Sequence, residues 1–125
     1  MVAVAAAVTM MHQALVYKLP PRQSSSRAYR AADWGLDKPL WKGRLKMTGR
    51  GKVCTVSLQD TASGDVFAES PIEGDPTLWV ESVSDSSRYF VLKIMNSGQH
   101  AFIGMGFQER TDAFDFNVAL QDFYK

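Results

Sequence analysis

The 125-residue sequence contains few of the residues that carry common catalytic and metal chemistry. It has one cysteine and two histidines, His12 and His100, and no Cys or His pair at metal-ligand spacing. It also lacks the Gly-x-Ser-x-Gly motif of serine hydrolases and a complete phosphate-loop pattern. We therefore predict no catalytic residue, no bound metal and no cofactor.

Internal disulfides and membrane-targeting segments are also missing. The single Cys54 lies in an apolar run, which predicts a reduced, intracellular protein with a buried thiol. The first sixteen residues carry no charge, so they lack the basic start of a secretory signal. His12 and Gln13 interrupt them well before the roughly 20 apolar residues that a membrane span needs. We predict a poorly ordered N-terminal segment at residues 1–13 and a single domain at residues 14–125.

An excess of positive charge is absent as well, because 14 Lys and Arg oppose 13 Asp and Glu. This balance argues against nucleic acid as a partner. The charges are nevertheless segregated: ten basic and two acidic residues precede Cys54, and four basic and eleven acidic residues follow it. Two interpretations stay open, namely a basic surface for an acidic partner, or two halves that neutralise each other across the fold.

What the sequence does contain is a series of short runs typical of β-strands, separated by turn residues. The predicted strands are residues 14–19, 40–47, 53–58, 66–70, 78–83, 88–95 and 100–107. Between the first two, residues 22–39 form a long excursion anchored by Tyr29 and Trp34. Gly104 and Gly106, two residues apart in the last run, leave one strand face flat, which favours close packing of a helix or strand.

The tail changes to a helical period. One face carries Ala113, Phe116, Leu120 and Phe123, and Thr111 or Asp112 is placed to cap the start. This order of elements predicts a mainly β protein: a pleckstrin-homology-like (PH-like) barrel of seven antiparallel strands capped by one C-terminal α-helix.

Two groups of residues are candidates for binding an anionic ligand. In the second predicted strand, alternation places Lys42, Arg44 and Lys46 on one face. This face is either a docking surface for an acidic peptide or phosphate headgroup, or an ordinary solvated sheet face. The second group consists of Ser86, Ser87 and Arg88 in a turn, joined by Arg110 at the helix start.

The polar residues of this turn also have a purely structural interpretation. Ser86 and the neighbouring Asp85 are also the residues that cap the backbone of their own turn. Phe114 lies off the apolar face of the predicted helix, which makes it a candidate to line a groove for Phe side chains rather than a core residue.

Several long segments resemble the adaptin ear-binding coat-associated protein (NECAP) family, and the resemblance runs from Val16 to the end of the chain. In the first half they are residues 16–22 (VYKLPPR), 29–34 (YRAADW) and 41–45 (WKGRL). In the second half they are residues 63–68 (SGDVFA), 85–92 (DSSRYFVL), 101–107 (AFIGMGF) and 112–120 (DAFDFNVAL).

The resemblance implies a PH-like module called the PHear domain, a non-enzymatic component of clathrin-coated-vesicle formation. Its implied partners are endocytic accessory proteins with Phe-x-Asp-x-Phe motifs and the clathrin adaptor complex. It further implies a cytoplasmic monomer that associates peripherally with coated vesicles and the plasma membrane through the coat. Two alternatives stay open: a phosphoinositide-binding PH domain that recruits its protein to membranes, and a purely structural barrel that binds neither ligand.

Overall fold

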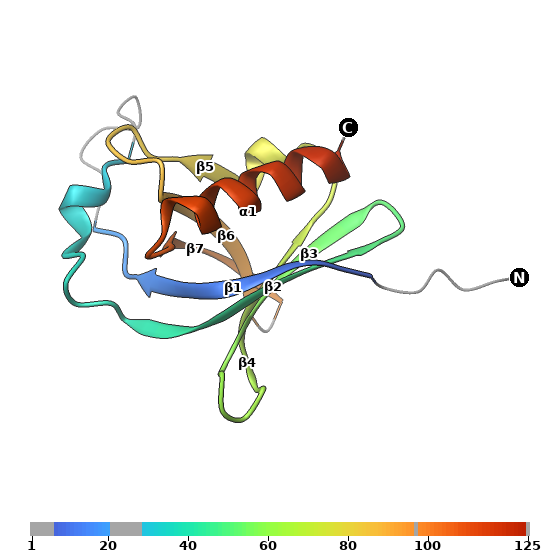
Figure 1. The fold of residues 1–125 in the computed structure, drawn as a ribbon, viewed down its shortest axis with the longest axis horizontal. Helices are drawn as coiled ribbons and strands as arrows, with labels where there is room; N and C mark the ends of the chain where they lie inside the picture. Colours follow the sequence, from blue (N-terminus) through green and yellow to red (C-terminus); the bar gives the residue numbers. More distant parts are fainter. Residues whose placement is uncertain (1–6, 21–28, 97, 125) are drawn as a thin grey trace, which may run out of the picture.

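The computed structural model describes residues 7–20, 29–96 and 98–124, which form seven strands, two 3-10 helices and one α-helix (Figure 1). The strands are β1 (Ala7–Tyr17), β2 (Trp41–Arg50), β3 (Val53–Gln59), β4 (Val66–Ile72), β5 (Val80–Ser82), β6 (Tyr89–Asn96) and β7 (Gln99–Gly106). The helices are η1 (Ala31–Trp34), η2 (Pro76–Leu78) and α1 (Arg110–Phe123).

The strands form one antiparallel sheet in the order β4-β3-β2-β1-β7-β6-β5. A pairing of Glu69 on β4 with Met95 on β6 closes the ring, so six strands form the barrel and β5 pairs with β6 outside it. The predicted PH-like barrel with a C-terminal helix is thus confirmed, with the three-residue strand β5 outside the closed ring.

The core fills the barrel and the space beneath α1. Buried and partly exposed residues alternate along β2 and β3, as the sequence pattern predicts for strands with one face in the core. From α1, the predicted residues Ala113, Phe116 and Leu120 are buried. Figure 1 shows α1 lying across the barrel, above β6 and β7 in this view. Burial of this helical face fixes α1 to the barrel.

A second apolar cluster lies on the outside of β1, β6 and β7. Trp34 from η1 packs with Tyr17 and Tyr89, and all three rings are buried. A Cβ atom on Gly104 would lie 2.8 Å from the Trp34 ring, and one on Gly106 would lie 2.2 Å from the Tyr89 ring. The glycines therefore permit close packing as predicted, although aromatic side chains rather than a helix or strand fill the space. Trp34 anchors the excursion that precedes β2.

The predicted start of the first strand and the predicted cap of the C-terminal helix are wrong. β1 begins at Ala7 rather than residue 14, because its backbone pairs with β2 as far as Ala7 opposite Gly49. Residues 7–13, predicted to be poorly ordered, therefore belong to the sheet, whereas residues 1–6 lie outside the described part of the chain. At the other end, Glu109 is the N-cap of α1, and no side chain caps it, so neither Thr111 nor Asp112 has the predicted role.

Candidate functional site

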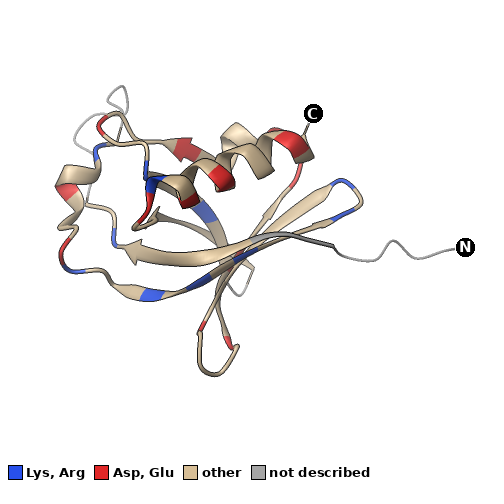
Figure 2. Cartoon of the chain, in the orientation of Figure 1, with Lys and Arg blue, Asp and Glu red and all other residues tan. Residues whose placement is uncertain are grey.

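The basic face of β2 has the geometry that the sequence predicts. Lys42 is exposed, and Arg44 and Lys46 are partly exposed, while the residues between them face the core. Figure 2 shows Lys and Arg, in blue, spaced along β2. The three cations therefore form a row, which we call the β2 basic stripe.

The neighbours of the β2 basic stripe leave its charge uncompensated. Its cross-strand partners on β1 and β3 are Leu15, Gln13, Met11, Gln59 and Ser57, and none of these is acidic. The guanidinium of Arg44 donates to the side-chain oxygen of Gln59 at 3.2 Å, a neutral acceptor. No ion pair involves the stripe in the described residues. An exposed row of cations of this kind attracts anionic groups.

Two polar residues of the turn between β5 and β6 accept hydrogen bonds from backbone N–H groups of the domain itself. The Asp85 carboxylate accepts hydrogen bonds from the backbone N–H groups of Ala31 (2.7 Å) and Ala32 (3.0 Å), and so caps η1 from a distant part of the sequence. The Ser86 hydroxyl accepts a hydrogen bond from the backbone N–H of Arg88 at 3.1 Å. The Ser86 contact matches the turn-capping interpretation, whereas Asp85 caps η1 rather than the backbone of its own turn.

Ser87, Arg88 and Arg110, by contrast, are exposed. The guanidinium of Arg88 donates to the carbonyl oxygen of Gln108 at 3.2 Å, and the carbonyl of Arg88 accepts from Phe107 at 3.0 Å. These bonds hold the turn against the segment that leads into α1, whose first residue is Arg110. Two arginines and the uncapped N-terminal amides of a helix therefore lie on neighbouring segments, an arrangement that favours an anion.

Phe114, the remaining candidate, lies on the outer face of α1 and is 67% exposed. The same helix buries Phe116 completely. The sequence correctly separates these two aromatics by face. No contact with the β2 basic stripe or with Arg88 is among those described for Phe114, so the structure does not join all the predicted residues into one pocket.

The capping role of Asp85 leads to a stability prediction. Burial tends to raise the pKa of Asp85, but the hydrogen bonds from Ala32 and Ala31 outweigh it, and the pKa is lowered. Asp85→Ala should lower the free energy of unfolding by about 1 kcal/mol at pH 7, as for loss of a helix cap. Because the folded-state pKa is depressed, this contribution is present above about pH 4 and is lost as the pH falls through the folded-state value.

Thermal melts of wild type and Asp85→Ala at pH 7 and about pH 3 measure this effect. We expect the difference in Tm to shrink at the lower pH. Asp85→Asn is the matched control, since it keeps one acceptor oxygen and removes the titration. An Asp85→Ala difference that is the same at the two pH values would show that the carboxylate charge is not what caps η1.

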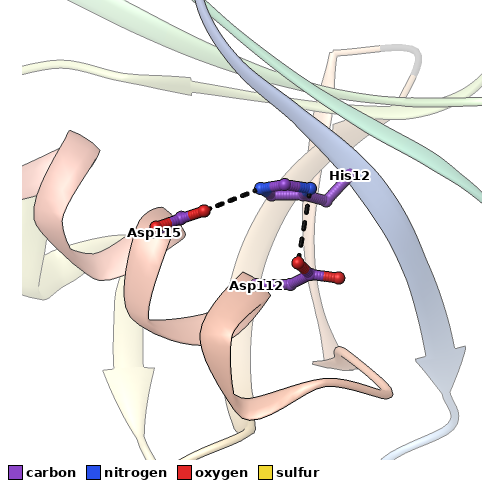
Figure 3. Close-up of polar contacts among 3 residues, drawn as sticks. All are labelled: His12, Asp112 and Asp115. Carbon is purple, nitrogen blue, oxygen red and sulfur yellow. Dashed lines mark hydrogen bonds and ion pairs between the residues drawn. The ribbon is translucent and has the colours of Figure 1, made fainter.

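His12 on β1 contacts the first turns of α1, a feature the sequence reasoning missed (Figure 3). Its Nε2 lies 3.1 Å from Asp115 Oδ2, and its Nδ1 lies 3.5 Å from Asp112 Oδ1. One ligand atom from each residue falls within a cluster 4.8 Å across. Each carboxylate thus faces a different nitrogen of the imidazole ring. This contact ties β1 to α1.

The remaining reactive group, Cys54, is fully buried in the core. Burial raises the pKa of its thiol to about 11, so the nucleophilic thiolate is scarce at neutral pH. None of the described helices combines the length and apolar character that crossing a bilayer requires.

Comparisons with known proteins identify the family. Residues 4–125 match the family described as "Protein of unknown function (DUF1681)". Over 111 residues the chain is 56% identical to adaptin ear-binding coat-associated protein 1 of Bos taurus, and 55% identical to protein 1 of Homo sapiens and protein 2 of Mus musculus. The chain belongs to the adaptin ear-binding coat-associated protein (NECAP) family. The aligned region covers 88% of this chain and 40–41% of these NECAP relatives.

The fold of this NECAP-family chain also has a counterpart among solved structures. The Ran binding domain of the nuclear pore complex component Nup2 from Ashbya gossypii superimposes with a TM-score of 0.63 at 12% identity. The superposition covers 94% of this chain and 95% of the other. At this identity the likeness extends to the PH-like fold alone, so the family relationship and not the fold carries the functional argument.

Proposed function

We propose that this domain is a non-enzymatic protein-binding module that acts in clathrin-coat assembly. The observation that carries the proposal is the 55–56% identity to proteins named for binding adaptin ears and for association with coats. The domain would act on the cytoplasmic side of coated vesicles and the plasma membrane, as a monomer held there through the coat.

Short acidic and aromatic peptides of the form Phe-x-Asp-x-Phe, carried by endocytic accessory proteins, are the first proposed ligands. In an extended peptide, the two Phe and the Asp side chains of this motif project from one face. The uncompensated charge of the β2 basic stripe (Lys42, Arg44 and Lys46) supports recognition of the Asp carboxylate. Phe114 supplies an exposed aromatic surface.

The clathrin adaptor complex is the second proposed partner, through an anionic group at the turn before β6. Arg88 and Arg110 offer guanidinium donors, Ser87 offers an exposed hydroxyl, and the N-terminus of α1 adds backbone N–H groups. A phosphate carries more charge than a carboxylate and accepts more hydrogen bonds. The specific proposal is therefore that these residues bind a phosphorylated segment of the adaptor.

Calorimetric titration distinguishes binding of these peptides from binding of a phosphoinositide. We expect a Phe-x-Asp-x-Phe peptide to bind with a Kd on the order of 10–100 μM, because two aromatic anchors and one charged contact must offset the ordering of the chain. Replacing the motif Asp with Asn, or raising salt to about 0.5 M, should weaken binding, because both reduce the attraction to the stripe. Calorimetry with the peptide and with phosphoinositide-containing vesicles measures both ligands under the same conditions.

The control for that titration is a vesicle without phosphoinositide. Binding to phosphoinositide vesicles in the absence of peptide binding would favour the alternative membrane-recruiting function. Peptide affinity that is indifferent to the Asp-to-Asn change and to salt would contradict the role of the β2 basic stripe.

A further inference from the structure

An imidazole and two carboxylates meet where the sheet contacts the C-terminal helix (Figure 3). His12 lies on the same face of β1 as Ala14 and Val16, which are buried in the core, so its side chain projects toward α1. Asp112 and Asp115 are three residues apart on α1 and therefore share one face of the helix. Two elements from opposite ends of the described chain thus bring three metal-ligating side chains together.

The charge of this cluster favours a cation. Two carboxylates face one imidazole ring, so the cluster keeps a net negative charge whether or not the ring carries an extra proton. Within the part of the chain that the structure describes, Asp112 and Asp115 form ion pairs with His12 and with no Lys or Arg. No backbone N–H of the described residues donates to either carboxylate. Both carboxylates therefore keep lone pairs that no other group of the domain uses.

The spacing of the donor atoms is close to that around a single metal ion. His12 Nε2 lies 3.1 Å from Asp115 Oδ2, and one ligand atom from each of the three residues falls within 4.8 Å of the others. Donors bound to a tetrahedral Zn²⁺ lie about 3.3–3.6 Å apart. Coordination of one ion therefore needs a movement of about 1–1.5 Å by one carboxylate, which rotation of a partly exposed Asp side chain supplies.

The chemical types of the donors select the class of metal. Imidazole nitrogen suits Zn²⁺ and other late transition metals, whereas Ca²⁺ and Mg²⁺ take oxygen ligands almost exclusively. One imidazole and two carboxylates form a three-residue set of the kind that binds Zn²⁺ and leaves the remaining position to water. The side chains of His12 and Asp112 are 29% and 27% exposed, so an ion can reach the site from solvent.

We propose that His12, Asp112 and Asp115 form a Zn²⁺ site that clamps β1 to α1. The site has no linear motif, because His12 and Asp115 are 103 positions apart in the sequence. For this reason the sequence-based expectation of no bound metal could not take it into account. The three side chains meet only in the folded domain, so Zn²⁺ should stabilise the fold. This inference is independent of the proposed peptide and adaptor binding.

Calorimetric titration of the untagged, metal-free chain with Zn²⁺ tests the proposal. We expect one ion to bind with a Kd on the order of 10 μM, weaker than a four-ligand structural site because three side chains bind it. About 100 μM Zn²⁺ should then shift the folding equilibrium about tenfold and raise the melting temperature by about 3–6 °C. His12→Ala should weaken Zn²⁺ binding at least tenfold and remove the rise in melting temperature. Asp115→Asn, which changes an exposed side chain, carries the same test if His12→Ala fails to fold.

Two matched controls separate this cluster from other parts of the chain. His100→Ala removes the other histidine, which is exposed on β7, and Asp122→Asn removes an exposed carboxylate elsewhere on α1. Both variants should bind Zn²⁺ as the wild type does. Absence of saturable binding to the wild type up to about 1 mM Zn²⁺ would overturn the proposal. Unchanged affinity in folded His12→Ala and Asp115→Asn, or Ca²⁺ binding as tight as Zn²⁺ binding, would overturn it as well.

Discussion

Replacing Phe116 with alanine is expected to lower the free energy of unfolding by about 3–5 kcal/mol. Phe116 is fully buried, and its ring centre lies 5.2 Å from that of Phe90 and 5.6 Å from that of Phe107. Truncation leaves a cavity at the junction between α1 and the barrel, so both helix docking and core packing lose contacts. Because small domains are stable by about 5–15 kcal/mol, the melting temperature should fall by about 10 °C or more in a calorimetric scan.

Phe114→Ala is the matched control on the same helix. Phe114 is 67% exposed, so its removal should shift the melting temperature by less than about 3 °C. Comparable melting of Phe116→Ala and wild type would show that α1 is not part of the cooperative unit. A large loss in Phe114→Ala would instead show that its exposed ring stabilises the domain.

Arg88→Ala is expected to weaken binding to the phosphorylated clathrin adaptor complex by about 1.5–3 kcal/mol, or roughly 10–150-fold in Kd. Within the described chain, the exposed guanidinium makes one hydrogen bond, to the Gln108 carbonyl, and lies 5.8 Å from the centre of the Tyr89 ring. Its loss should leave the barrel folded. Calorimetric titration measures the affinity, and a thermal melt of the same sample confirms the fold.

Arg50→Ala controls for the loss of one positive charge. Arg50 is an exposed residue at the end of β2, in a different hairpin from Arg88. Arg50→Ala should reduce affinity for the adaptor only slightly, through the loss of long-range electrostatic attraction. Equal affinity of wild type and Arg88→Ala for both forms of the adaptor would refute the anion site, and unfolding of Arg88→Ala would show that Arg88 is structural.

Local periodicity was enough to predict the features of the fold that repeat along the chain. The alternation on β2 separates the Lys42 face from the Leu45 face, and the helical period on α1 separates Phe114 from Phe116. These features follow from backbone geometry, because side chains alternate in strands and recur every three to four residues in helices.

Features that depend on contacts between distant residues were not predictable in this way. Asp85 caps η1 across more than fifty residues of sequence, and His12 meets Asp115 across more than one hundred. No local pattern marks either pair. The early start of β1 has a related cause, since residues 7–13 (AVTMMHQ) gain backbone hydrogen bonds from β2 without needing alternation of their own.

The cavity of about 280 Å³ that Trp79 borders shows the same limit. Its aromatic walls come from Tyr29, Trp79 and Phe102, which lie in three separate segments of the chain. Sequence patterns identify each of them as an aromatic in or near a strand or loop. They come together only through the pairing of β5 with β6 and of β6 with β7, and through the hydrogen bond from the Ser84 N–H to the Tyr29 carbonyl. A concave site assembled across a sheet has no linear motif.

The most direct test of the proposed coat-assembly function is the wild-type arm of the adaptor titration. Purified clathrin adaptor complex, phosphorylated and unphosphorylated, is titrated with the wild-type domain in a calorimeter. We expect saturable binding of the domain to the adaptor complex, tighter for the phosphorylated form. The absence of measurable heat or complex formation with either form, at domain concentrations of about 100 μM and with the fold intact, would contradict it.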